Sequence, residues 1–123
     1  MPSKETLERF VARVEESAHA EAIAEFYTES ASMRENMKPP RSGRDNLVAR
    51  ERKTLARARS VRSTCVRPVL ASGNTVVVRW IFEFDWLDGT STRLEELAYQ
   101  RWEGELIAEE QFFYDPSQLQ AGG

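Results

Sequence analysis

The last third of the chain alternates apolar and polar side chains in three runs, and this pattern predicts three β-strands. The runs cover residues 75–87, 92–102 and 106–114. Short turns separate them, with Asp88-Gly89 in the first turn and Gly104 in the second. Because aspartate and glycine tolerate the positive φ angles that hairpin loops require, neighbouring runs should pair antiparallel.

The first of these runs has a strongly aromatic face. Alternation places five apolar side chains on one side of the strand: Val78, Trp80, Phe82, Phe84 and Trp86. A chain of 123 residues has to cover an apolar surface of this size. The only segments available lie upstream, so we expect helices from the first half of the chain to pack against this face.

Two helices are predicted near the N-terminus. Apolar residues at positions 7, 10, 11 and 14 form the stripe of an amphipathic helix, and Ser3 is a plausible N-cap. Ser17-Ala18-His19 interrupts the stripe, which resumes in a short second helix over residues 23–27. We expect His19 to lie in the turn between the helices, exposed to solvent.

The middle of the chain predicts a strand, a helix and another strand. Residues 30–37 alternate, with Met33, Glu35 and Met37 on one side, and Pro39-Pro40 should end that strand. A third helix over 42–57 turns Leu47, Val48 and Leu55 inward and leaves Asp45 and Glu51 as surface charges. Residues 61–70 form the next strand, in which Cys65 is a small buried residue.

These elements predict one domain. Their order is α-α-β-α-β-β-β-β, with no repeat and no linker, so residues 1–118 form a single domain and residues 119–123 a flexible C-terminal tail.

Composition and charge limit the cellular compartment and the binding partners that can be expected. The net charge is −3, a single cysteine excludes an internal disulfide, and no apolar run reaches the roughly 20 residues of a membrane span. The N-terminus lacks the apolar core of a secretory signal. We therefore expect a cytoplasmic protein that binds neither membranes nor nucleic acids.

Charge is nevertheless uneven along the chain. Residues 41–67 contain nine basic and two acidic residues, whereas residues 83–115 contain ten acidic and two basic residues. The basic stretch could bind phosphate, or it could pair with the acidic sheet. No aromatic residues alternate with the bases, as they do in single-strand nucleic-acid sites, and this favours ion pairing.

Two segments resemble a known family. The stretch FYTESASMRENMKPPRSGRDNLV and the ending RWEGELIAEEQFFYDP are similar to patterns of the nuclear transport factor two-like superfamily, most closely its SnoaL-like polyketide-cyclase and ketosteroid-isomerase-like branch. The resemblance implies an α+β fold in which a cone-shaped, curved antiparallel sheet wraps around helices. It also implies an apolar pocket that opens at one end of the cone and dimerisation through the sheet.

Glu35 is the first catalytic candidate. If Met33 and Met37 are buried, Glu35 enters the same apolar pocket, where its pKa should rise and suit it to act as a general base. By resemblance, it falls on the position of the isomerases' catalytic base. The alternative is an ion pair between Glu35 and an arginine such as Arg34 or Arg41.

Other family positions differ in this chain. Phe10 stands where the isomerases have an oxyanion-hole tyrosine, and it cannot donate a hydrogen bond. Glu110 and Phe112 stand where the cyclases have histidine and aspartate. Chemistry therefore uses a different set of residues, or there is none.

The inferred inner faces supply that other set. Two carboxylates that approach each other in a dry pocket would share a proton and raise one pKa. The predicted catalytic residues are Glu35, Tyr114 and Glu110, and the predicted ligand-binding residues are Phe10, Tyr27, Met33, Met37, Trp80, Phe82, Glu96, Gln100 and Phe112. The alternative is a plain aromatic core, with Tyr114 and Trp102 bonded to backbone.

Two functions of different class remain open. One is proton transfer by an isomerase, cyclase or dehydratase on a hydrophobic carbonyl compound, without a cofactor or metal. The other is a non-catalytic module for ligand binding or dimerisation. One histidine and one cysteine argue against a zinc site, and no glycine-rich phosphate loop is present. We also expect a homodimer through the outer sheet face, where Ile81, Leu97, Tyr99 and Phe113 have no helix to cover them.

Overall fold

The computed structural model describes residues 1–119, which fold into three α-helices packed against one curved, unclosed sheet. The elements are α1 (Lys4–Glu15), α2 (His19–Phe26), β1 (Tyr27–Glu35), β2 (Arg41–Ser42), α3 (Arg44–Leu55), β3 (Ala58–Ser72), β4 (Thr75–Trp86), β5 (Ser91–Glu103), β6 (Leu106–Phe113) and the 3-10 helix η1 (Pro116–Leu119). The strand order is β2-β1-β6-β5-β4-β3. All neighbours pair antiparallel except β1 and β6, which run parallel. The predicted fold class is confirmed.

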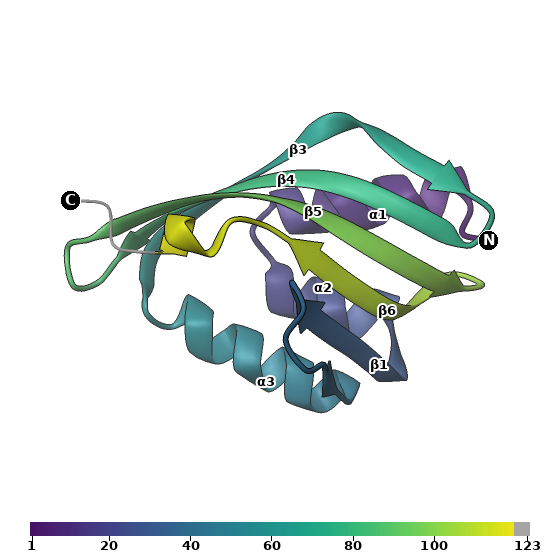
Figure 1. Cartoon of the computed structure of the whole chain (residues 1–123), viewed down its shortest axis with the longest axis horizontal. Coiled ribbons are helices and arrows are strands. Elements are labelled where there is room, and N and C mark those ends of the chain that lie inside the picture. The colour runs from purple at the N-terminus through teal and green to yellow at the C-terminus, as the bar shows by residue number, and fades with distance from the viewer. Residues whose placement is uncertain (120–123) are drawn as a thin grey trace.

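The long strands arch over the helices (Figure 1). Strands β3, β4 and β5 form the broad part of the sheet, with α1 and α2 against its concave face and α3 below them. The aromatic face of β4 points into this concavity, since Trp80 and Phe82 are buried while Arg79 and Glu83, on either side of this pair in the sequence, are exposed. The alternation therefore predicted both the strand and its buried face.

The turn between α1 and α2 is tighter than its sequence indicated. Ser3 caps α1 as expected, with its hydroxyl 3.0 Å from the Thr6 amide nitrogen. Ser17 has a φ of +61° and its amide bonds the Val14 carbonyl, so the turn ends before His19. His19 begins α2 and is 8% exposed. The prediction of a solvated His19 is wrong, because the helix turns this residue toward the sheet.

The first strand is shifted by a few residues from the predicted range. Tyr27 starts β1 instead of ending α2, and β1 ends at Glu35. Asn36 follows with a φ of +49° and bonds the Phe112 carbonyl through its amide. This turn breaks the alternation, so Met37 is 73% exposed and does not join Met33 inside. The placement of Met37 in the pocket is wrong for that reason.

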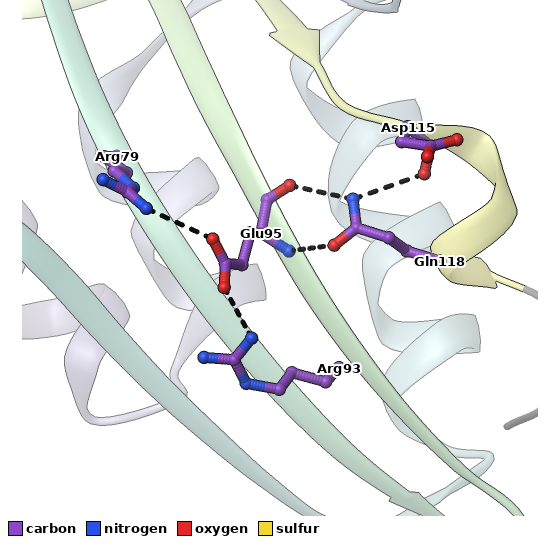
Figure 2. A network of polar contacts seen from close by, with 5 residues as sticks. All are labelled: Arg79, Arg93, Glu95, Asp115 and Gln118. Atoms are coloured by element: carbon purple, nitrogen blue, oxygen red, sulfur yellow. Dashed lines mark hydrogen bonds and ion pairs between the residues drawn. The ribbon is translucent and has the colours of Figure 1, made fainter.

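The C-terminal segment is tied to the sheet through Gln118 (Figure 2). Beyond the end of β6, the Gln118 side-chain amide accepts a hydrogen bond from the Glu95 N–H at 2.9 Å and donates one to the Glu95 carbonyl at 3.1 Å. Leu119, which the sequence assigned to a flexible tail, is the last residue of η1. The rest of that predicted tail, residues 120–123, lies outside the described residues. No helix within residues 1–119 combines the length and apolarity needed to cross a membrane.

Candidate functional site

The concave side of the sheet encloses an open cavity of about 770 Å³. This volume lies within the range of small-molecule sites. Nine of the predicted site residues line it: Phe10, Tyr27, Met33, Glu35, Trp80, Phe82, Glu96, Glu110 and Phe112. Further lining residues come from α2 and α3, so the cavity is built from α1, α2, β1, α3 and the inner faces of β4, β5 and β6.

One wall of the cavity is a continuous row of aromatic rings along β4. Trp80 and Phe82 stack with centroids 5.5 Å apart, and Phe84 and Trp86 stack at 4.7 Å. Trp80 is 2% exposed, whereas Trp86 is only partly buried. The row thus runs from the interior of the domain to the mouth of the cavity.

Glu110 lies on β6 at the centre of a buried hydrogen-bond network. Tyr27 donates from its hydroxyl to Oε1, and Gln100 donates to Oε2 at 2.6 Å. The Trp102 indole N–H, which can only donate, bonds the Gln100 carbonyl oxygen at 3.0 Å. Trp102 therefore fixes the Gln100 amide with its N–H₂ group toward Glu110. Gln100 is completely buried behind Glu110 and is not part of the cavity wall, which corrects its predicted direct contact with a ligand.

Burial and these two hydrogen bonds have opposite effects on the pKa of Glu110. Burial raises the pKa of Glu110 to about 7, although the hydrogen bonds from Tyr27 and Gln100 act in the other direction. Burial and the neighbouring Glu110 carboxylate raise the pKa of the Tyr27 hydroxyl well above its ordinary value. Tyr27 consequently keeps its proton and remains a donor. Glu110 is thus a carboxyl group that titrates close to neutral pH while both its oxygens accept hydrogen bonds.

Glu96 is the second buried carboxyl in the cavity, and it is held quite differently. It lies on β5, 8% exposed, and none of the described residues donates a hydrogen bond to its carboxyl. Burial, followed by the negative charges of Glu110, Glu35 and Glu51, raises its pKa to about 8. In the β5–β6 register Gln100 lies opposite Glu110. Glu96 lies four residues before Gln100 on the same face of β5.

Glu35 forms an ion pair with Arg41, which was the alternative to its role as a general base. Its Oε2 lies 3.0 Å from Arg41 Nη1, and its Oε1 accepts a hydrogen bond of 2.8 Å from the Tyr114 hydroxyl. Burial alone would raise the pKa of Glu35, but the bonds from Tyr114 and Arg41 outweigh it and the pKa is lowered. The prediction of a raised pKa is wrong because the carboxylate reaches these two donors. Tyr114 contacts Glu35 without lining the cavity itself.

A buried polar cluster at the opposite wall was missed from the sequence. His19 Nε2 lies 2.7 Å from Ser63 Oγ, and His19 Nδ1 lies 3.3 Å from Glu51 Oε1. Glu51 is partly buried and lines the cavity, so its assignment as a surface charge is wrong. The signal was available, because positions 19, 22, 23 and 26 form one helical stripe, as do positions 47, 51 and 54.

The order of carboxylate, imidazole and hydroxyl in this cluster is also found in serine hydrolases. Here, however, Ser63 does not line the cavity, and its hydroxyl lies 3.0 Å from Ser17 Oγ, which in turn bonds the Val61 carbonyl at 2.9 Å. We therefore assign these contacts to holding the α1–α2 turn against β3. Within residues 1–119 no group of three or more potential ligand side chains is arranged to hold a metal ion.

Comparison with known proteins agrees with this arrangement of helices, curved sheet and pocket. The family model described as the SnoaL-like domain matches residues 7–110, which is most of the chain. The chain belongs to the SnoaL-like family. The matched part includes Glu35, Glu96 and Glu110, whereas Tyr114 lies beyond it. No curated protein sequence matches the chain.

Solved structures show the same fold at low sequence identity. A hypothetical protein of Catenulispora acidiphila with a ketosteroid isomerase-like fold, in complex with trimethylamine, aligns with a TM-score of 0.78 and 16% identity over 95% of this chain and 90% of its own. A nuclear transport factor two-like protein of unknown function from Burkholderia pseudomallei aligns with a TM-score of 0.77 and 13% identity, covering 94% of this chain and 92% of its own. A Mesorhizobium loti protein provisionally named a SnoaL-like polyketide cyclase has a TM-score of 0.76 and 16% identity, over 93% and 100%. At these identities the SnoaL-like chain shares the fold alone with its structural neighbours.

Proposed function

We propose that this SnoaL-like protein catalyses proton transfer on an apolar carbonyl compound, as an isomerase, cyclase or dehydratase. The observation that carries the proposal is a pair of buried carboxyl groups in one cavity with different surroundings. Glu110 receives two hydrogen bonds, which favour its charged form, whereas Glu96 receives none from residues 1–119. Environments that separate two carboxyls in this way define an acid and a base.

Each residue then has a defined role. Ionised Glu110 removes a proton from the carbon next to the substrate carbonyl. Protonated Glu96 donates a hydrogen bond to the carbonyl oxygen as negative charge develops there, and supplies the donor that Phe10 cannot. In an isomerisation Glu110 then returns the proton to the same or to a conjugated carbon, whereas in a dehydration it passes the proton to the β-hydroxyl group, which leaves as water; neither cycle needs another reactant. The aromatic row on β4 holds the apolar body of the substrate and excludes water.

Glu35, which the sequence predicted to be catalytic, is the alternative to Glu110 as the base. Its lowered pKa makes it a weaker proton acceptor than Glu110. The contacts with Arg41 and Tyr114 suit it better to fixing the ends of β1 and β6 beside the cavity. Separate variants of the two glutamates distinguish these roles.

Hydrogen–deuterium exchange tests the proposal. The apolar ketone 2-tetralone is incubated with the protein in deuterated buffer, and loss of its α-proton signals is followed by NMR. Glu110→Gln should reduce the protein-dependent rate by at least about 100-fold, the range that general-base catalysis contributes. Glu109→Gln is the matched control, because Glu109 is the exposed neighbour on the opposite face of β6. A rate that survives in Glu110→Gln but is lost in Glu35→Gln would transfer the role of base to Glu35.

The pH profile follows from the two pKa values. The reaction needs Glu110 ionised, which sets an acidic limb near pH 7, and Glu96 protonated, which sets a basic limb near pH 8. We expect kcat/KM to form a narrow bell with its maximum between these values. Glu96→Gln stays neutral at all pH values, so it should lose the basic limb while it keeps the acidic one.

The second candidate function is non-catalytic binding of a small amine. Glu96 and Glu110 lie in an aromatic pocket beside Trp80 and Phe82, surroundings that attract an ammonium group. The relative from Catenulispora acidiphila was solved with trimethylamine. Saturable binding of trimethylamine by this chain, together with no exchange of ketone protons, would favour the binding function.

We also propose a homodimer through the outer face of the sheet. Leu97, Tyr99 and Phe113 are 44%, 49% and 41% exposed there, and Leu97 lies opposite Phe113 in the β5–β6 register. An apolar patch of this kind on adjacent strands is typical of an interface. Arg79 and Arg93, which flank the patch, both pair with Glu95 (Figure 2).

A further inference from the structure

The mouth of the cavity carries a row of cations on one side of α3. Arg50, Lys53 and Arg57 all line the cavity, and their positions follow the i, i+3, i+7 spacing of one helical face. Arg57 lies just beyond the helix, where its amide bonds the Thr54 carbonyl at 3.1 Å and continues the last turn. The sequence favoured pairing of this basic stretch with the acidic sheet over phosphate binding.

These three cations do not pair with the sheet. Among the described residues, none of them has a carboxylate within ion-pair distance. Glu51 and Asp88 also line the cavity near these cations, but each already has another partner. Glu51 Oε1 lies 3.3 Å from His19 Nδ1, and Asp88 Oδ1 accepts hydrogen bonds from the Thr90 amide at 2.9 Å and hydroxyl at 2.6 Å. The mouth therefore holds an excess of positive charge.

The cations also stand at the end of the aromatic row. The Arg57 guanidinium lies over the Trp86 ring, 5.3 Å from its centroid, and Trp86 stacks on Phe84. An elongated apolar molecule that lies along the row from Trp80 would place its outer end beside Arg57. A ligand with an apolar body and one negatively charged end would match both the aromatic row and the cations beside it.

We propose that Arg50, Lys53 and Arg57 form an anion subsite at the cavity mouth, and that the ligand is an amphipathic molecule with a carboxylate or phosphate end. This inference rests on the proposed function, because it names the class of molecule that the same cavity binds. The carbonyl group of such a ligand would lie deeper, beside Glu96 and Glu110, with the anionic end held at α3.

Competitive displacement of a neutral dye tests the subsite. N-phenyl-1-naphthylamine, an uncharged apolar fluorophore, reports occupation of the cavity at pH 7.5. It is then displaced by decanoate, decyl phosphate or 1-decanol, which differ in the end group. We expect at least one of the two anions to displace the dye at about tenfold lower concentration than decanol does, and the better of the two identifies the end group.

Charge variants locate the effect. Arg57→Gln and Lys53→Gln should each weaken the better anion about three- to fivefold, the range of a single partly exposed ion pair, and leave decanol unchanged. Arg52→Gln is the matched control, because Arg52 shares the last turn of α3 but does not line the cavity. It should have no effect. Equal displacement by decanol and both anions, or equal losses in Arg52→Gln and Arg57→Gln, would overturn the subsite while leaving the proton-transfer function intact. Failure to bind the dye at all would remove the apolar pocket and both proposals with it.

Discussion

Replacing Glu96 with glutamine should remove most of the pH dependence of folding that this residue creates. Folded Glu96 keeps its proton up to about pH 8, whereas the unfolded residue releases it near 4.5. Because the folded pKa is raised, the stabilisation is complete below about pH 4.5, declines as the pH rises, and is lost above about 8. Glutamine is nearly isosteric with protonated glutamate and does not titrate.

The size of the effect follows from the same values. A rise of the pKa from 4.5 to about 8, at about 1.4 kcal/mol for each pH unit, amounts to a difference on the order of 4 to 5 kcal/mol. This is a large fraction of the 5 to 15 kcal/mol that typically stabilises a domain. Glu96→Gln should therefore lie within about 1 kcal/mol of the wild type at pH 5 and exceed its unfolding free energy by about 4 to 5 kcal/mol at pH 9.

Urea unfolding followed by tryptophan fluorescence at pH 5, 6, 7, 8 and 9 provides the measurement. Glu95→Gln is the control, because Glu95 is the exposed neighbour on the opposite face of β5. Hydrogen bonds from Arg93 and Arg79 lower the pKa of Glu95, so its contribution changes only as the pH falls below its unfolded value. If Glu96→Gln and the wild type gave parallel curves over this range, Glu96 would not be a buried acid and its assigned role would fail.

Three further predictions concern the core, the network and the surface. Phe82→Ala should lower the unfolding free energy by about 3 to 5 kcal/mol, because Phe82 is 8% exposed and stacks on Trp80; a cost below about 1 kcal/mol in urea unfolding would show that the site can collapse or is not core. Trp102→Phe should free the Gln100 amide to rotate, weaken its bond to Glu110 and move the acidic limb of the kcat/KM profile to higher pH; an unmoved limb would mean that Trp102 does not orient Gln100. Light scattering at micromolar concentration should find a dimer for the wild type and Tyr99→Phe and a monomer for Tyr99→Glu, and a monomeric wild type would remove the proposed interface.

The sequence predicted the fold because its strongest signals were local. The alternation in β4 and the turns at Asp88-Gly89 and Gly104 define the hairpins, and the stripe of α1 defines the helix that covers them. The parallel pairing of β1 with β6 was not predicted, because it joins residues about 80 positions apart and no local pattern encodes it. The same contact contributes the turn at Asn36 that turns Met37 outward.

The sequence predicted which residues line the candidate site better than it predicted their partners and pKa values. Alternation identified Glu96 and Glu110 as inward-facing, and the structure places both in the cavity. Which carboxyl finds a partner depends on side chains from other elements, such as Tyr27 for Glu110 and Arg41 for Glu35. Those partners decide the direction of each pKa, and only the assembled cavity shows them. His19 was misplaced for a different reason, because its helical stripe was overlooked.

The proposed chemistry requires two carboxyl groups in one cavity that titrate near neutral pH. Carbon-13 NMR measures the pKa values of these groups directly. Protein labelled at the glutamate side-chain carboxyl carbon is titrated from pH 3 to 10, and Glu96→Gln and Glu110→Gln assign the two signals. We predict one carboxyl with a pKa of about 7 and one of about 8, each lost in its own variant, while Glu35 titrates below its ordinary value. If every glutamate signal titrated below about pH 5.5, the acid and base assigned to this cavity would be contradicted.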